Sequence, residues 1–432
     1  MLYCFARILM RTGLRFFYRH IYVTGMEHIP SQGPVIIIAN HPSSLMDAAL
    51  LGVLLRRPLW YFTRGDVFIN PPVRKLLSWL HMIPVHQHEK GRASINANDG
   101  SFLDARSILG NNGIIVFFPE SVSHTEHRLW PFRKGVFRLA FQTMADHDFL
   151  LRLPIVPIGI TYDHPTAGRQ CVQVHAGRPL QMGDYIRLYQ SNPSAALLRI
   201  VKDAQDRVAN KVLHINDAGR CAVTEQCLTV YRNDHPQQVR AWKIASRERL
   251  EEEQAICGYI NQVGGEELAT IQEKNTAYFD ALKKYGLEDK TIAGLVVRVF
   301  TNQSGGWKGL LLWAGFPLYL AGLILNGLPV WIARRTADKK VRRDDFYSWI
   351  FVSGYCLLYF VWMLALVITA GFFSWQYAVA LIPVMALTGL FGYKWVGWQQ
   401  QAQQHDSLKR LSQLDIKTLK QLRRNVSIPS RS

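Results

Sequence analysis

Three apolar segments in the last third of the chain constrain its fold most. They cover residues 309–333, 349–373 and 375–395, and each is apolar over roughly the 20 residues that a helix needs to cross a bilayer. Trp and Tyr residues near their ends suit the membrane–water interface. We therefore predict a membrane region at residues 306–398.

Basic residues around these segments indicate the topology. The loop 334–343 carries six Lys or Arg residues against one Asp, and residues 399–432 form a basic tail predicted to be an amphipathic helix. Because positive loops stay cytoplasmic, the last two segments are predicted to form a hairpin. If the first segment crossed the membrane fully, this loop and the N-terminal domain would lie on opposite sides. The prolines and glycines of the first segment predict a bent, re-entrant helix instead. The expected protein is multi-pass, with its N-terminal domain facing the cytoplasm.

The charge balance narrows the expected partners. Of 432 residues, 50 are Lys or Arg and 32 are Asp or Glu, which gives a net charge of +18. This balance suits anionic lipid headgroups or another acidic partner. Because the charge lies beside apolar stripes, no nucleic acid is expected. The six cysteines include no CxxC pair, so we expect no metal and a reduced, cytosol-facing location.

The first 30 residues predict an amphipathic helix. An arginine recurs every fourth residue from Arg7 to Arg19, beside aliphatic and aromatic side chains. These arginines leave no uninterrupted apolar core for a signal peptide. Residues 1–30 are interpreted as a membrane-interface helix, and the alternative is an ordinary helix packed on the following domain.

An α/β domain is predicted at residues 31–190, with a largely parallel sheet flanked by helices. Short apolar runs that alternate with helical stretches predict its strands, at residues 34–39, 83–85, 113–118, 153–162 and 171–175. Residues 191–305 are polar and helical, and are interpreted as an extension that covers this domain or pairs with another chain in a homo-oligomer.

The segment that follows the first of these strands carries the candidate chemistry. Asn40-His41-Pro42-Ser43-Ser44 ends the strand, and Ser43 or Ser44 is expected to cap a helix whose first turn contains Asp47. Asp47 can then hold one ring nitrogen of His41 and leave the other to accept a proton. The alternative is a purely structural His–Asp pair.

Two further groups follow neighbouring elements. Glu120 comes after the strand at 113–118, and because active groups collect beyond the carboxyl ends of parallel strands, it is expected to share a crevice with His41. Arg133 and Lys134 open the next helix and supply two cations. Glu120 can alternatively be interpreted as a structural brace of its loop. Arg133 and Lys134 can alternatively be interpreted as the solvated start of a helix.

The order of these blocks resembles the lysophospholipid acyltransferase superfamily, membrane enzymes with an NHX4D-type motif. Asn40-His41…Asp47 looks like its catalytic block, with five residues between His and Asp in place of four. That spacing is similar to the branch of fungal-type glycerol-3-phosphate and dihydroxyacetone-phosphate acyltransferases, as are, more weakly, residues 278–282 and 286–289.

Two departures from the family pattern concern the acceptor. Ser121 stands where the family has Gly, which requires that the backbone there is not left-handed. Gln87 stands where the family has an Arg thought to hold a phosphate, and it cannot make a bidentate charged contact. Nearby cations that could replace this Arg are Arg64, Lys90 and Arg92.

The resemblance implies an acyltransferase without a cofactor. Its donor would be acyl-CoA or acyl-carrier protein, and its acceptor glycerol 3-phosphate or dihydroxyacetone phosphate, with lysophosphatidic acid or another lysophospholipid as the alternative. His41 would be the general base and Asp47 its orienting partner. A less favoured alternative is an inactive lipid-binding protein on the same fold. Further substrate-binding candidates are Asn40, Ser44, Arg64, Lys90, Arg92, Glu120, Ser121, Ser123, Arg133 and Lys134.

Overall fold

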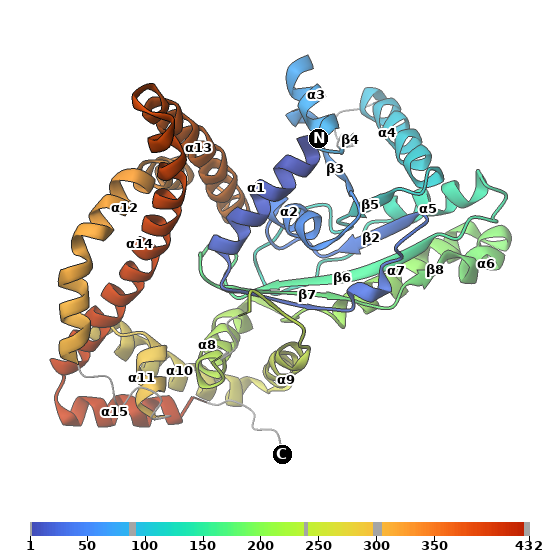
Figure 1. Ribbon diagram of the computed structural model, residues 1–432. Coiled ribbons are helices and arrows are strands. Elements are labelled where there is room, and N and C mark those ends of the chain that lie inside the picture. Colours follow the sequence, from blue (N-terminus) through green and yellow to red (C-terminus); the bar gives the residue numbers. More distant parts are fainter. Residues whose placement is uncertain (1, 86–91, 237–240, 297–304, 427–432) are drawn as a thin grey trace. The chain divides into compact units, whose positions relative to one another are not determined.

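The computed structural model describes residues 2–85, 92–236, 241–296 and 305–426, and the chain divides into two compact units (Figure 1). The first, here called the sheet unit, comprises Met1–His214, Ala241–Glu251 and Lys340–Ser353. The second, the helical unit, comprises Ile215–Arg240, Glu252–Lys339 and Gly354–Ser432.

A nine-stranded sheet forms the sheet unit, in the order β4-β3-β5-β2-β6-β7-β1-β9, with β8 beside β6. Its pairs are parallel except β6 with β7 and β6 with β8, so the predicted, largely parallel sheet is confirmed. The strands are β1 (His20–Thr24), β2 (Val35–Ala39), β3 (Trp60–Arg64), β4 (Met82–Val85), β5 (Ile114–Phe117), β6 (Pro154–Tyr162), β7 (Cys171–Ala176), β8 (Leu180–Gln181) and β9 (Lys243–Ile244).

Helices flank this sheet, as Figure 1 shows. They are α1 (Leu2–Phe17), α2 (Leu45–Leu54), α3 (Pro71–Trp79), α4 (Arg92–Gly110), α5 (Gly135–Ala145), α6 (Ile186–Ser191) and α7 (Pro193–Ala209). All five residues of β2 and all nine of β6 are buried, because both faces of the central sheet are covered. One core joins Ile36 and Ile38 of β2 to Phe137 and Phe141 of α5 and Ile200 of α7. This packed core fixes the carboxyl ends of the central strands.

The N-terminal helix α1 packs on α2 within the sheet unit. It buries Leu14 and Phe17, and the Arg7 guanidinium donates hydrogen bonds to the carbonyl oxygens of Leu55 and Arg56. Part of α1 therefore packs as an ordinary amphipathic helix does. Its predicted place at the membrane interface stays a prediction.

Within its described residues, the helical unit is built from α-helices. They are α8 (Ala218–Asp234), α9 (Glu248–Gln262, shared with the sheet unit), α10 (Gly265–Tyr285), α11 (Asp289–Val296), α12 (Gly305–Lys340), α13 (Asp344–Phe373, whose first ten residues belong to the sheet unit), α14 (Trp375–Lys409) and α15 (Gln413–Arg424). Leu312–Lys340, Asp344–Phe373 and Trp375–Lys409 are long and apolar enough to cross a membrane, as predicted. The first is one continuous helix through Pro317 and Pro329, and its re-entrant path stays a prediction.

A buried ion pair ties the tail to the helical unit. Arg423 of α15 donates to Asp289 (Nε to Oδ1, 2.8 Å), which also accepts the Tyr278 hydroxyl. Arg423 pairs with Asp234 as well, at 2.7 Å. The segments 278–282 and 286–289, which resemble the fungal-type branch, thus supply part of a packed structural network.

Candidate active site

His41 and Asp47 meet at the carboxyl end of β2. His41 follows this strand directly, and Asp47 lies in the first turn of α2. The Nδ1 atom of His41 is 2.9 Å from Oδ2 of Asp47, as the sequence spacing predicted. The Asp47 side chain is fully buried, whereas that of His41 is 18% exposed. The imidazole is therefore anchored on its buried side and open on the other.

Two more donors hold the Asp47 carboxylate. The Ser43 backbone N–H donates to Oδ2 at 2.9 Å, and the Tyr162 hydroxyl of β6 donates to Oδ1 at 2.6 Å. Burial and the charge of Asp47 raise the pKa of Tyr162 well above its usual value, so this hydroxyl stays a donor. Because the carboxylate only accepts, Nδ1 of His41 carries a proton and Nε2 is left as the base.

The serines after His41 do not cap α2 as predicted. Ser44 occupies the N-cap position, but its φ of 47° lies in the left-handed region and its side chain makes no capping bond. The Ser43 hydroxyl is buried and has no hydrogen-bond partner among the described residues. The Asp47 carboxylate instead satisfies the Ser43 N–H from inside the helix.

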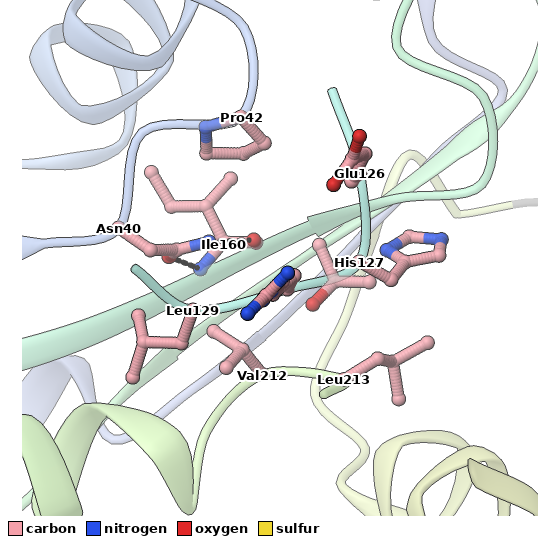
Figure 2. Close-up of a pocket in the computed structure, with 10 residues that line it drawn as sticks. Asn40, Pro42, Glu126, His127, Leu129, Ile160, Val212 and Leu213 are labelled. Carbon is pink, nitrogen blue, oxygen red and sulfur yellow. Dashed lines mark hydrogen bonds between the residues drawn. The ribbon is translucent and has the colours of Figure 1, made fainter. Parts of the chain in front are cut away.

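Asn40 locks the end of β2 to β6. Its side-chain amide donates to the Ile160 carbonyl at 2.8 Å and accepts from the Ile160 N–H at 2.7 Å (Figure 2). Both polar ends of the amide are thus bound to the backbone of β6, which fixes the strand end that carries His41.

Glu120 lies next to the His41–Asp47 pair, in the loop that follows β5. The loop is held there because the His124 N–H donates to the His41 carbonyl at 3.1 Å, and the rings of Phe118 and His41 stack at 4.0 Å. Glu120 is 7% exposed, and its Oε1 has no hydrogen-bond partner among the described residues. Burial, then the charge of Asp47, raise the pKa of Glu120 to about 8, against the lowering effect of backbone N–H groups.

Ser121 adopts a left-handed backbone, with φ at 68°. We expected a backbone that is not left-handed at this serine, and this expectation was wrong. Its N–H closes a turn onto the Phe118 carbonyl at 3.1 Å, and this turn directs the chain from Glu120 towards Ser123. A glycine would adopt this conformation without strain, whereas the serine bears a cost.

Ser123 contacts residues that lie far away in the sequence but in the same sheet unit. Its hydroxyl donates to the buried Asp345 carboxylate in the first turn of α13. Arg343 donates to the same carboxylate at 3.0 and 2.8 Å, and its Nη2 lies 3.4 Å from the Ser123 carbonyl oxygen. The start of α13 is thereby bound to the loop that carries Glu120.

The candidate cations lie in different places. The Arg64 side chain, at the end of β3, is 58% exposed and pairs with Asp66. Arg133 and Lys134 are exposed at the start of α5, and the Arg133 N–H donates to the Pro119 carbonyl at 2.8 Å, beside Glu120. Lys90 and Gln87 lie outside the described residues, as does the side chain of Arg92.

A small pocket lies beside the end of β2 (Figure 2). Asn40 and Pro42 form one wall, Ile160 and Thr161 another, and the rest comes from residues 126–129 with Val212 and Leu213. Among the described residues that line it, neither His41 nor Asp47 appears.

Several of these contacts were not predicted. Tyr162, Phe118, Arg343 and Asp345 were not singled out as site residues. Tyr162 had one available signal, because it ends a predicted strand and so lies at the sheet edge where active groups gather. For Asp345 we find no signal, since it lies 222 residues from Ser123.

A family model described as Acyltransferase matches residues 20–161, the segment that contains His41, Asp47 and Glu120. Residues 20–161 are an acyltransferase domain. The resemblance to the lysophospholipid acyltransferase superfamily is thus confirmed.

Named relatives share this acyltransferase domain. An uncharacterised acyltransferase of Schizosaccharomyces pombe is 22% identical over 57% of this chain and 38% of its own length. Glycerol-3-phosphate O-acyltransferase 1 of Saccharomyces cerevisiae is 23% identical over 54% of this chain and 31% of its own. A 1-acyl-sn-glycerol-3-phosphate acyltransferase of Cocos nucifera is 32% identical over 30% of this chain and 38% of its own. The chain spans about a third of the length of these relatives.

A solved structure is also similar. The 1-acyl-sn-glycerophosphate acyltransferase of Thermotoga maritima matches with 18% identity and a TM-score of 0.34, over 46% of this chain and 78% of that protein.

Proposed function

We propose that the acyltransferase domain transfers a fatty acyl group from a thioester to a hydroxyl of a glycerol-phosphate acceptor, with His41 as general base. The observation that carries this proposal is the 2.9 Å contact between Nδ1 of His41 and the buried Asp47 carboxylate. It leaves Nε2 as the proton acceptor on the exposed side of the ring.

The proposed reaction begins when His41 Nε2 takes the proton of the acceptor hydroxyl. The hydroxyl oxygen attacks the thioester carbonyl, the C–S bond breaks, and the leaving thiolate receives the proton from the imidazolium. An ester and a free thiol result. The Asp47 carboxylate stabilises the imidazolium while it exists.

Two acceptors are supported by the relatives. One relative is named a glycerol-3-phosphate acyltransferase and another a 1-acyl-sn-glycerol-3-phosphate acyltransferase. We place glycerol 3-phosphate or a related glycerolipid acceptor first and lysophosphatidic acid second. The thioester donor is acyl-CoA or acyl-carrier protein, and the strongly basic chain suits the negative charge of both.

The enzyme is proposed to be a multi-pass membrane protein with its acyltransferase domain on the cytoplasmic side. The support for this placement is the basic segment 334–343, which the structure forms from the end of α12 and the turn before α13 rather than from the predicted loop, because Lys340–Ser353 belongs to the same compact unit as His41. An active site close to the bilayer would release its lipid product directly into it.

The test compares purified His41→Ala and Asp47→Asn with the parent protein. Acceptor-dependent release of free thiol is measured with each donor and each acceptor. We expect both variants to fold, and to lose roughly 10²–10⁴-fold in rate. His147→Ala, which changes an exposed histidine, is the control and should keep full activity. Retained activity in His41→Ala would refute the mechanism.

A further inference from the structure

Helix α3 is a nine-residue helix that buries none of its residues. It connects β3 to β4, the strand at one edge of the sheet. Asn70 caps it by accepting the Val73 N–H at 3.0 Å, and Pro71 and Pro72 begin its first turn. Caps alone do little for a helix of this length, because helices shorter than roughly 12–15 residues are marginal in water.

Large apolar side chains project from α3 and from the turn before it. Ile69 is 76% exposed and Trp79 is 54% exposed, and Val67 and Leu76 are exposed as well. A continuous set of exposed apolar side chains marks a surface that contacts a partner. Such a partner would also stabilise the short helix, by removing these side chains from water.

The charges around these side chains are mostly positive. Between residues 64 and 80 the chain carries Arg64, Arg74 and Lys75 against Asp66 alone. The Lys75 ammonium lies 5.1 Å from the centre of the Trp79 ring. An indole with a cation beside it suits the interface between lipid headgroups and acyl chains, and positive charge attracts anionic lipids.

The start of α1 adjoins this region. The Tyr3 ring stacks on His81, two residues after α3, at 4.6 Å, and His81 stacks on Trp60 at 4.3 Å. Figure 1 shows the N-terminus beside α3. Phe5 and Ile8 of α1 are exposed. The first turn of α1 thus lies beside the end of α3, and α1 carries exposed apolar side chains of its own.

We propose that Val67, Ile69, Leu76 and Trp79 form a docking surface for a lipid bilayer that contains anionic lipids. We call it the α3 surface. It is separate from the three apolar helices of the C-terminal third, and it does not depend on the proposed reaction. Its first residues follow the carboxyl end of β3. Because β3, β5 and β2 are parallel, His41 follows β2 at the same end of the sheet, so docking would bring lipid near that end.

The test measures lipid contact of single fluorophores on the full-length protein. Cysteines are introduced as Ile69→Cys and Leu76→Cys in a background with the exposed and half-buried cysteines replaced (Cys4→Ser, Cys171→Ser and Cys221→Ser). The labelled proteins are reconstituted in vesicles of brominated phosphatidylcholine with and without phosphatidylglycerol. The control is Leu150→Cys. Leu150 is 85% exposed and precedes β6, so it lies at the amino ends of the parallel strands, the opposite end of the sheet. We expect several-fold stronger quenching at positions 69 and 76 than at 150, and stronger quenching with phosphatidylglycerol.

Equal quenching at the three positions would overturn the proposal. If a second copy of the chain covered the α3 surface instead, labels at position 69 of two molecules would show energy transfer without lipid quenching. A Leu76→Ser/Trp79→Ser variant provides a second measurement. It should melt like the parent protein in detergent but lose the phosphatidylglycerol-dependent quenching at position 69, and unchanged quenching would also contradict the proposal.

Discussion

At the residue scale, two carboxyl groups at one end of the sheet have opposite surroundings. Asp47 accepts hydrogen bonds from His41, Ser43 and Tyr162, whereas Oε1 of Glu120 has no partner among the described residues. Burial without a partner for Oε1 accordingly raises the pKa of Glu120 to about 8, and the charge of Asp47 adds to this rise. A protonated Glu120 can donate a hydrogen bond to a bound acceptor, which an ionised one cannot.

The raised pKa of Glu120 makes folding stability depend on pH. The unfolded pKa is 4.5 and the folded one about 8, so the native state binds the proton more tightly. Its contribution is complete below the unfolded pKa and is lost as pH rises through the folded pKa, by at most about 1.4 kcal/mol per unit. We expect Glu120→Gln to gain stability relative to the parent between about pH 5 and about pH 9. Thermal midpoints of both proteins across this range measure it, and a constant difference would contradict the assignment.

Ser121 predicts a stabilising substitution. A left-handed backbone costs a non-glycine residue roughly 1–2 kcal/mol, and glycine loses about 0.4–1 kcal/mol through unfolded-state entropy. Ser121→Gly should therefore raise the free energy of unfolding by on the order of 0.5–1 kcal/mol. Denaturant titration in detergent measures the gain. Ser121→Ala keeps the Cβ atom and should show none, so a similar gain in both variants would exclude backbone strain as the cause.

At the element scale, the start of α13 is attached to the loop that carries Glu120. Asp345 is buried and accepts hydrogen bonds from Ser123 and Arg343, while Ser348 donates to the Pro165 carbonyl and Phe351 packs near Phe17. These contacts join an apolar helix to three separate parts of the sheet unit. They hold the loop beside His41 in place.

Loss of the Asp345 carboxylate should weaken this attachment. Asp345→Ala leaves the buried Ser123 hydroxyl without its acceptor, which costs about 1–3 kcal/mol. Asp344→Ala is the matched control, because Asp344 lies in the same first helical turn but is exposed. Both variants lose a favourable charge near the helix N-terminus, so only the difference between their thermal midpoints reports on the attachment. Equal midpoints would show that this contact contributes nothing.

At the scale of the whole molecule, the residues that belong to the sheet unit restrict the possible membrane topologies. Lys340–Ser353 belongs to the same compact unit as His41, so we expect the basic turn 341–343 between α12 and α13 to lie on the same side of a membrane as the acyltransferase domain. The turn between α13 and α14 is then expected on the other side, because α13 is long enough to cross.

Cysteine labelling tests this topology. In sealed vesicles, a membrane-impermeant maleimide should label Lys339→Cys and Leu150→Cys from the same side of the membrane. It should label Ser374→Cys only when the reagent is present on the other side. Each variant is made in the Cys4→Ser/Cys171→Ser/Cys221→Ser background, with detergent-permeabilised vesicles as the control for reactivity. Labelling of position 374 together with position 150 would refute the hairpin.

Elements with a strong pattern were predictable, and mixed ones were not. The continuous apolar runs of β2, β5 and β6 predicted these buried strands. The strands β1 and β3 were missed, because their short sequences mix apolar and polar residues without a clear period. The capping of α2 was predicted wrongly, because the N–H groups of Met46 and Asp47 donate to the carbonyl oxygens of Ser43 and Ser44 rather than to a serine hydroxyl.

The sequence by itself determined the contact of His41 with Asp47 and the positions of the apolar helices. The five residues 40–44 that join a strand end to a first helical turn leave little freedom. The length and composition of a segment suffice to show that it can cross a bilayer. The tertiary structure alone decided that Tyr162 supports Asp47, that Glu120 lies near it without a partner for Oε1, and that Asp345 binds Ser123. These contacts join residues far apart in the sequence, so they depend on strand order and chain crossings, which no local pattern encodes.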